Sequence, residues 1–284
     1  MRFSLCNEVL GHLEFARQCE YAAALGYDGL EVAPFTLDEN PHLMGSNQRA
    51  AIRRAASDAG IAVSGLHWLL IKPPHLSITA ADPAVRARTL EVMRRLIDLC
   101  AELGGQVLVH GSPAQRRIPE GAEDRDGAAD AARRRGREAF AAIAEDADKA
   151  GVTYCIEPLA PPDCNFINRL DEAAELVRQI ANDHVRTMID CSAASIAEGR
   201  PLETLIDQWL PTDLVAHIQF NDRNRRGPGQ GAVRFAPVLA ALHRNNYKGW
   251  AAVEPFDYRP DGAGSAARAI GYLRGIEESI SWRA

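Results

Sequence analysis

Short apolar runs alternate with longer amphipathic stretches along the whole chain. The stretches repeat apolar residues with the period of an α-helix, and in residues 82–104 Asp82 suits the N-cap, Pro83 the first turn and Gly104 the C-terminal cap. Eight runs rich in Val, Ile and Leu have the character of buried strands, namely residues 2–7, 29–34, 62–70, 106–111, 152–158, 186–191, 215–221 and 250–255. Eight strand–helix units in succession predict an α/β fold, a single (β/α)₈ TIM barrel domain over residues 1–284.

The predicted loops are unequal in length. Connections from helix to strand are short, as in residues 25–29 and 58–62, whereas three connections from strand to helix are long and polar: residues 112–127, 159–168 and 222–233. These long loops follow the carboxyl ends of strands, the face on which barrels of this type carry their catalytic residues. The sequence therefore predicts a functional site at that face.

Composition narrows the class of protein. An apolar fraction of 46% and a charged fraction of 25% are ordinary for a globular core, and a net charge of −6 argues against a nucleic-acid partner. The six cysteines show no C-x-x-C pair, which favours reduced thiols. The N-terminus lacks the pattern of a secretory signal, and no window approaches the ~18 apolar residues of a membrane span. We therefore expect a cytoplasmic protein without a membrane partner.

Four polar side chains lie in or at the ends of the last four predicted strands. Glu157 and Glu254 are each followed by a proline, Asp190 ends the sixth strand, and His217 lies in the seventh. Each of them taken alone is equally well explained as a hydrogen-bonded strand end. Taken together they would converge on the barrel axis, where three carboxylates repel one another unless a cation is present. The set predicts one divalent metal ion, with Mn²⁺ as the first expectation and Mg²⁺ or Co²⁺ as alternatives.

These residues resemble a known family. Glu157 in "IEP", Asp190 in "MID", His217 in "HIQFNDR" and Glu254 in "VEPF" are similar to the metal ligands of the xylose-isomerase-like TIM barrels. The chain is most similar to the sugar (phosphate) isomerase/epimerase branch, which includes ketose 3-epimerases and hydroxypyruvate isomerase. Arg223, six residues after His217, resembles the substrate-binding arginine of ketose 3-epimerases, and the "PGQG" loop also fits the family pattern.

The resemblance implies a metal-dependent sugar isomerase or epimerase. Glu157 and Glu254 would move a proton on a ketose or keto-sugar through a metal-stabilised enediolate. A small carbohydrate substrate and a homo-oligomer are the partners it implies. Further substrate-binding candidates, for which a purely structural role is the alternative, are His67, Trp68, His110 and Arg225.

Two departures from the family pattern bear on the substrate. Position 193 is alanine where many relatives have a histidine, and the run "EPLAPPDCNF" replaces an asparagine–arginine pair and a second glutamate. A metal-dependent lyase or dehydratase acting on a keto-sugar or 3-keto-glycoside by the same chemistry is therefore the main alternative. An AP-endonuclease-like nuclease and a non-catalytic sugar-binding barrel are lesser ones.

Overall fold

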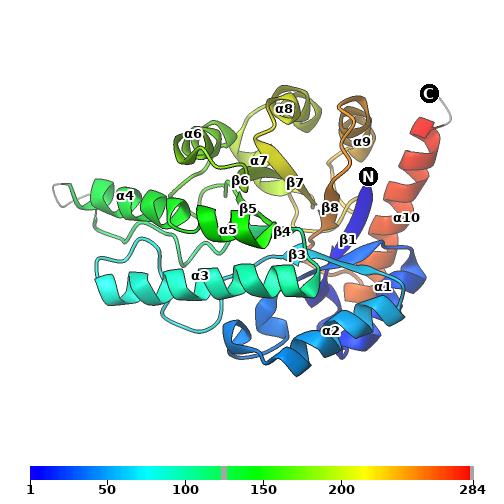
Figure 1. Ribbon diagram of the computed structural model, residues 1–284. Coiled ribbons are helices and arrows are strands. Elements are labelled where there is room, and N and C mark those ends of the chain that lie inside the picture. The colour runs from blue at the N-terminus through cyan, green and yellow to red at the C-terminus, as the bar shows by residue number, and fades with distance from the viewer. Residues whose placement is uncertain (123–126, 282–284) are drawn as a thin grey trace.

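The computed structural model describes residues 1–122 and 127–281 and confirms the predicted (β/α)₈ TIM barrel (Figure 1). Every neighbouring pair of strands is parallel, and β1 pairs with β8 to close the barrel. The domain limits of residues 1–284 stay a prediction. The strands are β1 (Arg2–Cys6), β2 (Gly29–Val32), β3 (Ala62–Leu66), β4 (Val107–His110), β5 (Thr153–Ile156), β6 (Val185–Asp190), β7 (Val215–Phe220) and β8 (Trp250–Val253).

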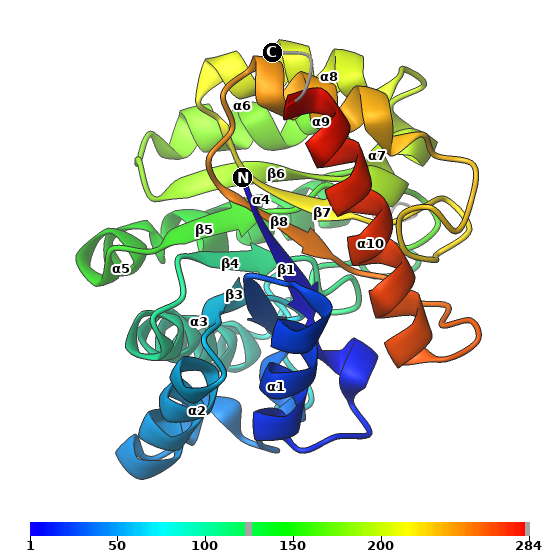
Figure 2. The ribbon, with the colours of Figure 1, turned by 90° about the vertical axis from the view of Figure 1, so that its right-hand side faces the viewer.

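Helices surround the barrel, and the two views at right angles show them as an outer layer around the strands (Figures 1 and 2). The α-helices are α1 (Phe15–Leu25), α2 (Ser46–Asp58), α3 (Pro83–Leu103), α4 (Ala128–Ala141), α5 (Ala144–Ala150), α6 (Leu170–Ile180), α7 (Cys191–Ala197), α8 (Leu202–Trp209), α9 (Phe235–Arg244) and α10 (Gly262–Ser281). Short 3₁₀ turns are η1 (Asn7–Leu10), η2 (Pro34–Thr36), η3 (Pro41–Leu43) and η4 (Leu210–Thr212).

Local sequence signals account for the element ends. Asp82 caps α3 by accepting a hydrogen bond from the backbone N–H of Ala84 at 2.8 Å, and Gly104 ends the helix in the left-handed region at φ 84°. The predicted strands coincide with the observed ones but several extend too far toward their carboxyl ends. The predicted strand 62–70, for example, ends at Leu66.

The core lies mainly between the barrel and the helices. Leu108, Ile189 and Phe220 belong to this outer core, whereas the alternate strand residues Val109, Cys155 and Met188 form part of a small separate cluster. The alternation follows from the period of two in a strand, which sends successive side chains to opposite faces. Side chains of the second set therefore fill the barrel interior and set the orientation of the polar residues above them.

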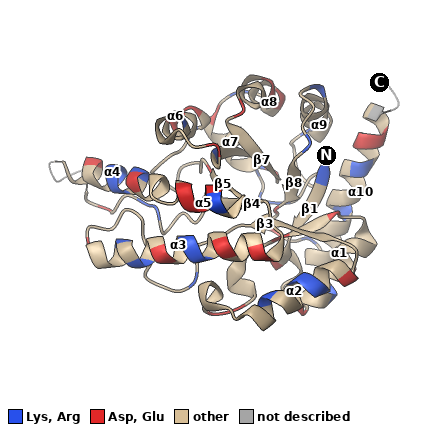
Figure 3. Cartoon of the chain, in the orientation of Figure 1, with Lys and Arg blue, Asp and Glu red and all other residues tan. Residues whose placement is uncertain are grey.

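Charged side chains of both signs are spread along the outer helices, as α3, α4 and α5 show in Figure 3. In the part of the chain that the structure describes, none of the helices has the length and apolar character needed to cross a bilayer.

Candidate active site

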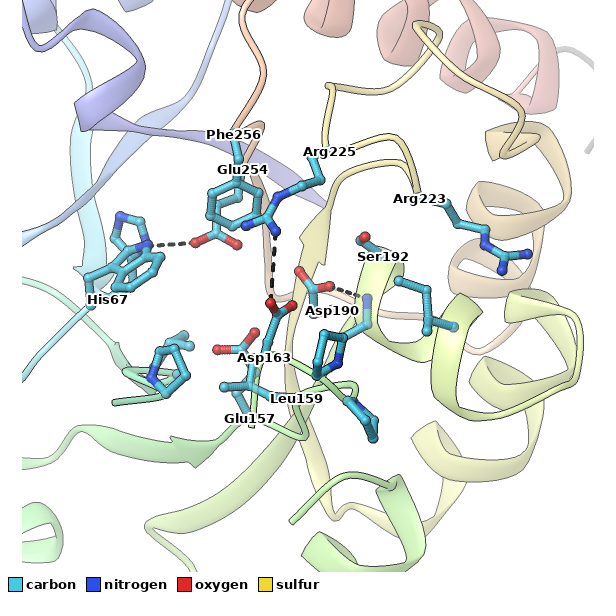
Figure 4. A pocket seen from close by; sticks show the side chains of 18 residues that line it. His67, Glu157, Leu159, Asp163, Asp190, Ser192, Arg223, Arg225, Glu254 and Phe256 are labelled. Atoms are coloured by element: carbon cyan, nitrogen blue, oxygen red, sulfur yellow. Dashed lines mark hydrogen bonds and ion pairs between the residues drawn. The ribbon is translucent and has the colours of Figure 1, made fainter. Parts of the chain in front are cut away.

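A cavity of about 340 Å³ opens at the carboxyl ends of the strands, on the face that the long loops predict. Its lining comes from the ends of β3, β4, β5, β6 and β8 and from the loops that follow β5, β7 and β8 (Figure 4). Among the described residues, the carboxylates of Glu157, Asp190 and Glu254 form a group in which one oxygen atom of each lies within 4.8 Å of the others. Three of the four predicted metal ligands therefore meet at one point.

Strand geometry brings the three carboxylates together. Glu157 directly follows β5, Asp190 is the last residue of β6, and Glu254 directly follows β8. The three residues are buried, at 4 to 6% exposed. Gly111, after β4, leaves room for one of them, because a Cβ at this position would lie 1.9 Å from Oε2 of Glu157.

The three carboxyl groups resist ionisation together. Burial and the charges of Glu254 and Asp190 raise the pKa of Glu157 well above its usual range. Burial raises the pKa of Asp190 to about 6 and that of Glu254 to about 8. Three anions this close in a water-poor site require a cation or bound protons, and a divalent cation meets that requirement.

Asp190 is held by two hydrogen bonds as well. Its Oδ1 accepts from the backbone N–H of Ala193 at 2.7 Å, which caps α7, and its Oδ2 accepts from Nδ2 of Asn221 at 2.6 Å. Asn221 also accepts from the backbone N–H of Ser192 at 2.7 Å. The end of β7 and the first turn of α7 thus fix the carboxylate from two sides.

His67 lies between two carboxylates. Its Nδ1 is 3.1 Å from Oε1 of Glu254, and its Nε2 is 3.0 Å from Oε2 of Glu8 on η1. Burial by itself lowers the pKa of His67, but the two glutamates outweigh burial and raise it well above its usual value. His67 thus orients Glu254, and Cys6, Glu8, His67 and Glu254 form a second group with metal-ligand atoms close together.

His217, the fourth predicted ligand, does not join the three carboxylates in the described structure. Its Nε2 lies 2.9 Å from Oε1 of Glu31, below the cavity. Burial tends to raise the pKa of Glu31, but His217 and other partners outweigh it and leave it at about 2. Gln219 donates to the other oxygen of Glu31 at 3.1 Å, and its own Oε1 is buried without a hydrogen-bond partner among the described residues.

The predicted substrate-binding residues differ in their placement. Trp68, Arg223, Arg225 and His67 line the cavity. His110 does not: its Nδ1 is 2.7 Å from the hydroxyl of Tyr154, and its ring packs edge-on against Phe140 of α4 at 4.8 Å between centroids. The side chain of His110 faces the helix layer, so its predicted contact with substrate finds no support in this placement.

Sequence reasoning missed several residues of the site. Gln219 and Asn221 lie on the same face of β7 as His217, and the period of two was a signal that could have found them. Glu8 and Gly111 carried no such signal, because contacts between separate strands position them.

Comparison with known proteins places this arrangement in context. The model of the Xylose isomerase-like TIM barrel family matches residues 19–276. A D-psicose 3-epimerase from Agrobacterium fabrum is 28% identical over 248 residues, which cover 86% of this chain and 80% of that protein. A 2-oxo-tetronate isomerase from Cupriavidus necator is 29% identical over 48% of this chain and 50% of its own length. The crystal structure of a 3-keto-D-glucoside 4-epimerase from E. coli superposes with a TM-score of 0.82 at 20% identity, covering 97% of this chain and 99% of the other.

Proposed function

The chain belongs to the xylose isomerase-like TIM barrel family, and from this premise we propose that it is a divalent-metal-dependent epimerase or isomerase of a ketose or keto-sugar. The observation that carries the proposal is the group of three buried carboxylates, Glu157, Asp190 and Glu254, at the base of a cavity of sugar size. Relatives that are named sugar epimerases and isomerases support the reaction class.

The donor set fits a hard divalent cation. Carboxylate and amide oxygens suit Mn²⁺ and Mg²⁺, and a cation offsets the mutual repulsion that raises the pKa of Glu157. When bound, a divalent cation would stabilise the negative charge that develops on substrate oxygens as the neighbouring C–H loses its proton. Mn²⁺ remains the first candidate.

Glu157 and Glu254 are the proposed acid and base. They follow β5 and β8, with β6 and β7 between them, so they reach a substrate from different sides of the cavity. One carboxylate removes a proton from the carbon beside the carbonyl, and the other returns a proton to the opposite face or to the neighbouring carbon. His67 orients Glu254 through the contact of 3.1 Å with its Oε1. A positioned acid–base pair contributes ~10²–10⁴-fold to the rate.

For the fourth ligand, the observations favour Gln219 over the predicted His217. In the ladder between β6 and β7, Asp190 lies opposite Gln219, whereas His217 lies opposite Met188, one pleat further from the cavity. The unpartnered Oε1 of Gln219 is the type of oxygen that a hard cation binds. The ring nitrogens of His217 also lack a hydrogen-bond partner among the described residues, but Nε2 lies 2.9 Å from Oε1 of Glu31.

The proposal is tested by solvent exchange. Protein loaded with Mn²⁺ is incubated with a panel of ketoses and keto-sugars in D₂O, and NMR detects deuterium at carbons next to a carbonyl. We expect deuterium exchange with at least one member of the panel. The rate of this exchange should be lower by ~10²-fold or more in Glu157→Gln and in Glu254→Gln. Elimination products in place of exchange would show the lyase chemistry instead.

Metal binding is measured separately, from the EPR signal of free Mn²⁺. We expect Gln219→Leu to weaken binding more than the double variant Glu31→Gln/His217→Gln, which keeps polar groups at both positions. If the double variant loses the metal and Gln219→Leu keeps it, His217 is the ligand.

A rate of deuterium exchange that is unchanged in Glu157→Gln would contradict the proposed acid–base roles. Binding of sugar without turnover in the unaltered protein would favour a non-catalytic barrel.

A further inference from the structure

We propose that the natural substrate is a keto-sugar derivative that carries an apolar substituent, such as an alkyl or aryl group, and that the outer part of the cavity binds this substituent. The inference rests on the proposed function and names the substrate class of the same site. Its basis is the contrast between the carboxylate base of the cavity and the apolar side chains contributed by the loops above it.

The loops beyond the strand ends supply apolar side chains from several directions. Trp68 is the second residue after β3, and Leu159 and Phe256 are each the third residue after β5 and β8. Pro161 and Ile196 add to the same lining. In Figure 4, Phe256 and Leu159 lie on different sides of the carboxylates. A group attached to a sugar bound at the carboxylates would therefore meet apolar surface.

This surface is preformed and exposed. The Trp68 and Phe256 rings meet edge to face with centroids 6.2 Å apart, and the guanidinium of Arg225 lies 5.0 Å from the Phe256 ring. The backbone N–H of Phe256 donates to the carbonyl of Arg225 at 2.7 Å, which fixes the loop. Ile196 and Phe256, at 45% and 37% exposed, are two of the five large apolar side chains that are exposed in the described part of the chain. Exposed apolar surface gathered at a cavity favours an apolar ligand.

The polar groups of the outer cavity do not suit a bare polyol. Apart from the arginines, the polar side chains near its mouth are Asp163 and Ser192, so most hydroxyls of a free hexose chain would lose their water without gaining a partner. Arg225 is engaged by Asp163 at 3.8 Å as well as by Phe256.

Matched probes test the inference. D-psicose, 6-O-benzyl-D-psicose and D-psicose 6-phosphate are compared in the D₂O exchange assay, and binding is followed independently by quenching of tryptophan fluorescence. We expect kcat/KM for exchange to be at least about tenfold higher with the benzyl ether than with D-psicose, because an apolar group that leaves water gains free energy in proportion to its buried area. Quenching by the benzyl ether should decrease in Trp68→Phe.

Two variants locate the effect. Phe256→Ala should bring the ratio of kcat/KM for the benzyl ether to kcat/KM for D-psicose close to one. Tyr21→Ala, which removes a similarly exposed ring from α1, should leave this ratio unchanged. Equal or lower kcat/KM with the benzyl ether, or the highest value with the phosphate, would overturn the inference while leaving the proposed reaction intact. Tenfold tighter binding of the benzyl ether without exchange of any probe would keep the inference and refute the proposed reaction.

Discussion

The carboxylate of Glu157 occupies space that the absence of a side chain at Gly111 leaves free. A Cβ at position 111 would meet Oε2 of Glu157 at 1.9 Å and its carboxyl carbon at 3.0 Å. The clash involves the end of a side chain and not backbone, so the glutamate can move away at little cost to the fold. A side chain at position 111 would instead affect the site, because the carboxylate of Glu157 would move away from Asp190 and Glu254.

Gly111→Ala should therefore weaken Mn²⁺ binding and reduce exchange activity by ~10-fold or more, with the free energy of unfolding of the metal-free protein changed by less than about 1 kcal/mol. Mn²⁺ titration by EPR and urea unfolding measure the two effects. The control is Gly271→Ala on α10, where an added Cβ meets nothing within 4 Å. Wild-type Mn²⁺ affinity in Gly111→Ala would contradict the prediction.

Oε1 of Glu31 lies 2.9 Å from Nε2 of His217 in the barrel interior, and both residues are wholly buried. His217→Leu should lower the free energy of unfolding by about 3–5 kcal/mol, because it leaves the buried carboxylate of Glu31 without its imidazole partner. Glu31→Gln/His217→Gln should recover much of this loss, since the double variant has no carboxylate at position 31. Urea unfolding measures both, and equal stability of the single and double variants would count against the pairing.

The prediction of His217 as a metal ligand rests on residue type and on its resemblance to the family motif. An imidazole is a common metal ligand, but the position along the strand decides which side chain lies beside Asp190, and in the ladder that position belongs to Gln219. The choice between His217 and Gln219 also decides which arginine lies six residues further along the chain. A count of six residues from His217 ends at Arg223, whereas a count of six from Gln219 ends at Arg225, which contacts Asp163 and Phe256.

At the scale of elements, periodicity predicted all eight strands and their closure into a barrel. Strand ends were less accurate, because the residues that follow Leu66, among them Trp68 and Leu70, continue the apolar pattern beyond the end of β3. The approach of Glu157, Asp190 and Glu254 was predictable, since carboxyl ends of barrel strands share one face. The outward direction of His110 was not, because it depends on which of two alternating faces each residue of β4 occupies.

The junction of β7 with α7 gives a prediction at this scale. Asn221 links the two elements by donating to Asp190 and accepting from the N–H of Ser192. Asn221→Ala should weaken Mn²⁺ binding by ~10–100-fold, the usual effect of removing a group that orients a ligand. Asn245→Ala is the matched control, because Asn245 links α9 to Asp207 of α8 away from the cavity. An equal effect of the two variants on Mn²⁺ affinity would show that Asn221 acts only through general stability.

At the scale of the whole molecule, the barrel tolerates a cluster of carboxyl groups that opposes its stability. The fold places them at the ends of β5, β6 and β8, where all three line the cavity. Burial of the apolar core therefore stabilises the fold enough to offset the unfavourable approach of these carboxyl groups. Binding of a ligand to them stabilises the folded protein further.

The stability of the whole protein should for this reason depend on pH and on Mn²⁺ together. In the folded state the pKa of Glu254 is raised from 4.5 to about 8 and that of Asp190 from 3.8 to about 6. At these two carboxyl groups the folded metal-free protein thus binds more protons than the unfolded chain between about pH 4 and pH 8, so their contribution to the free energy of unfolding falls as pH rises.

We expect the Tm of the metal-free protein, measured by differential scanning calorimetry, to be lower at pH 8 than at pH 5. Mn²⁺ at ~100 times its Kd should raise the Tm at pH 8 by roughly 5 °C, because binding contributes ~2.7 kcal/mol at that ratio. The same concentration of Mn²⁺ should raise the Tm by less at pH 5, because protons compete there with the cation for the same oxygens. Glu254→Gln serves as the control, since it removes one titrating carboxyl group and should flatten the pH dependence without metal. A Tm that rises from pH 5 to pH 8 in the metal-free protein, or a Mn²⁺ effect that is equal at the two pH values, would show that these carboxylates do not compete for protons and cation as the buried cluster requires.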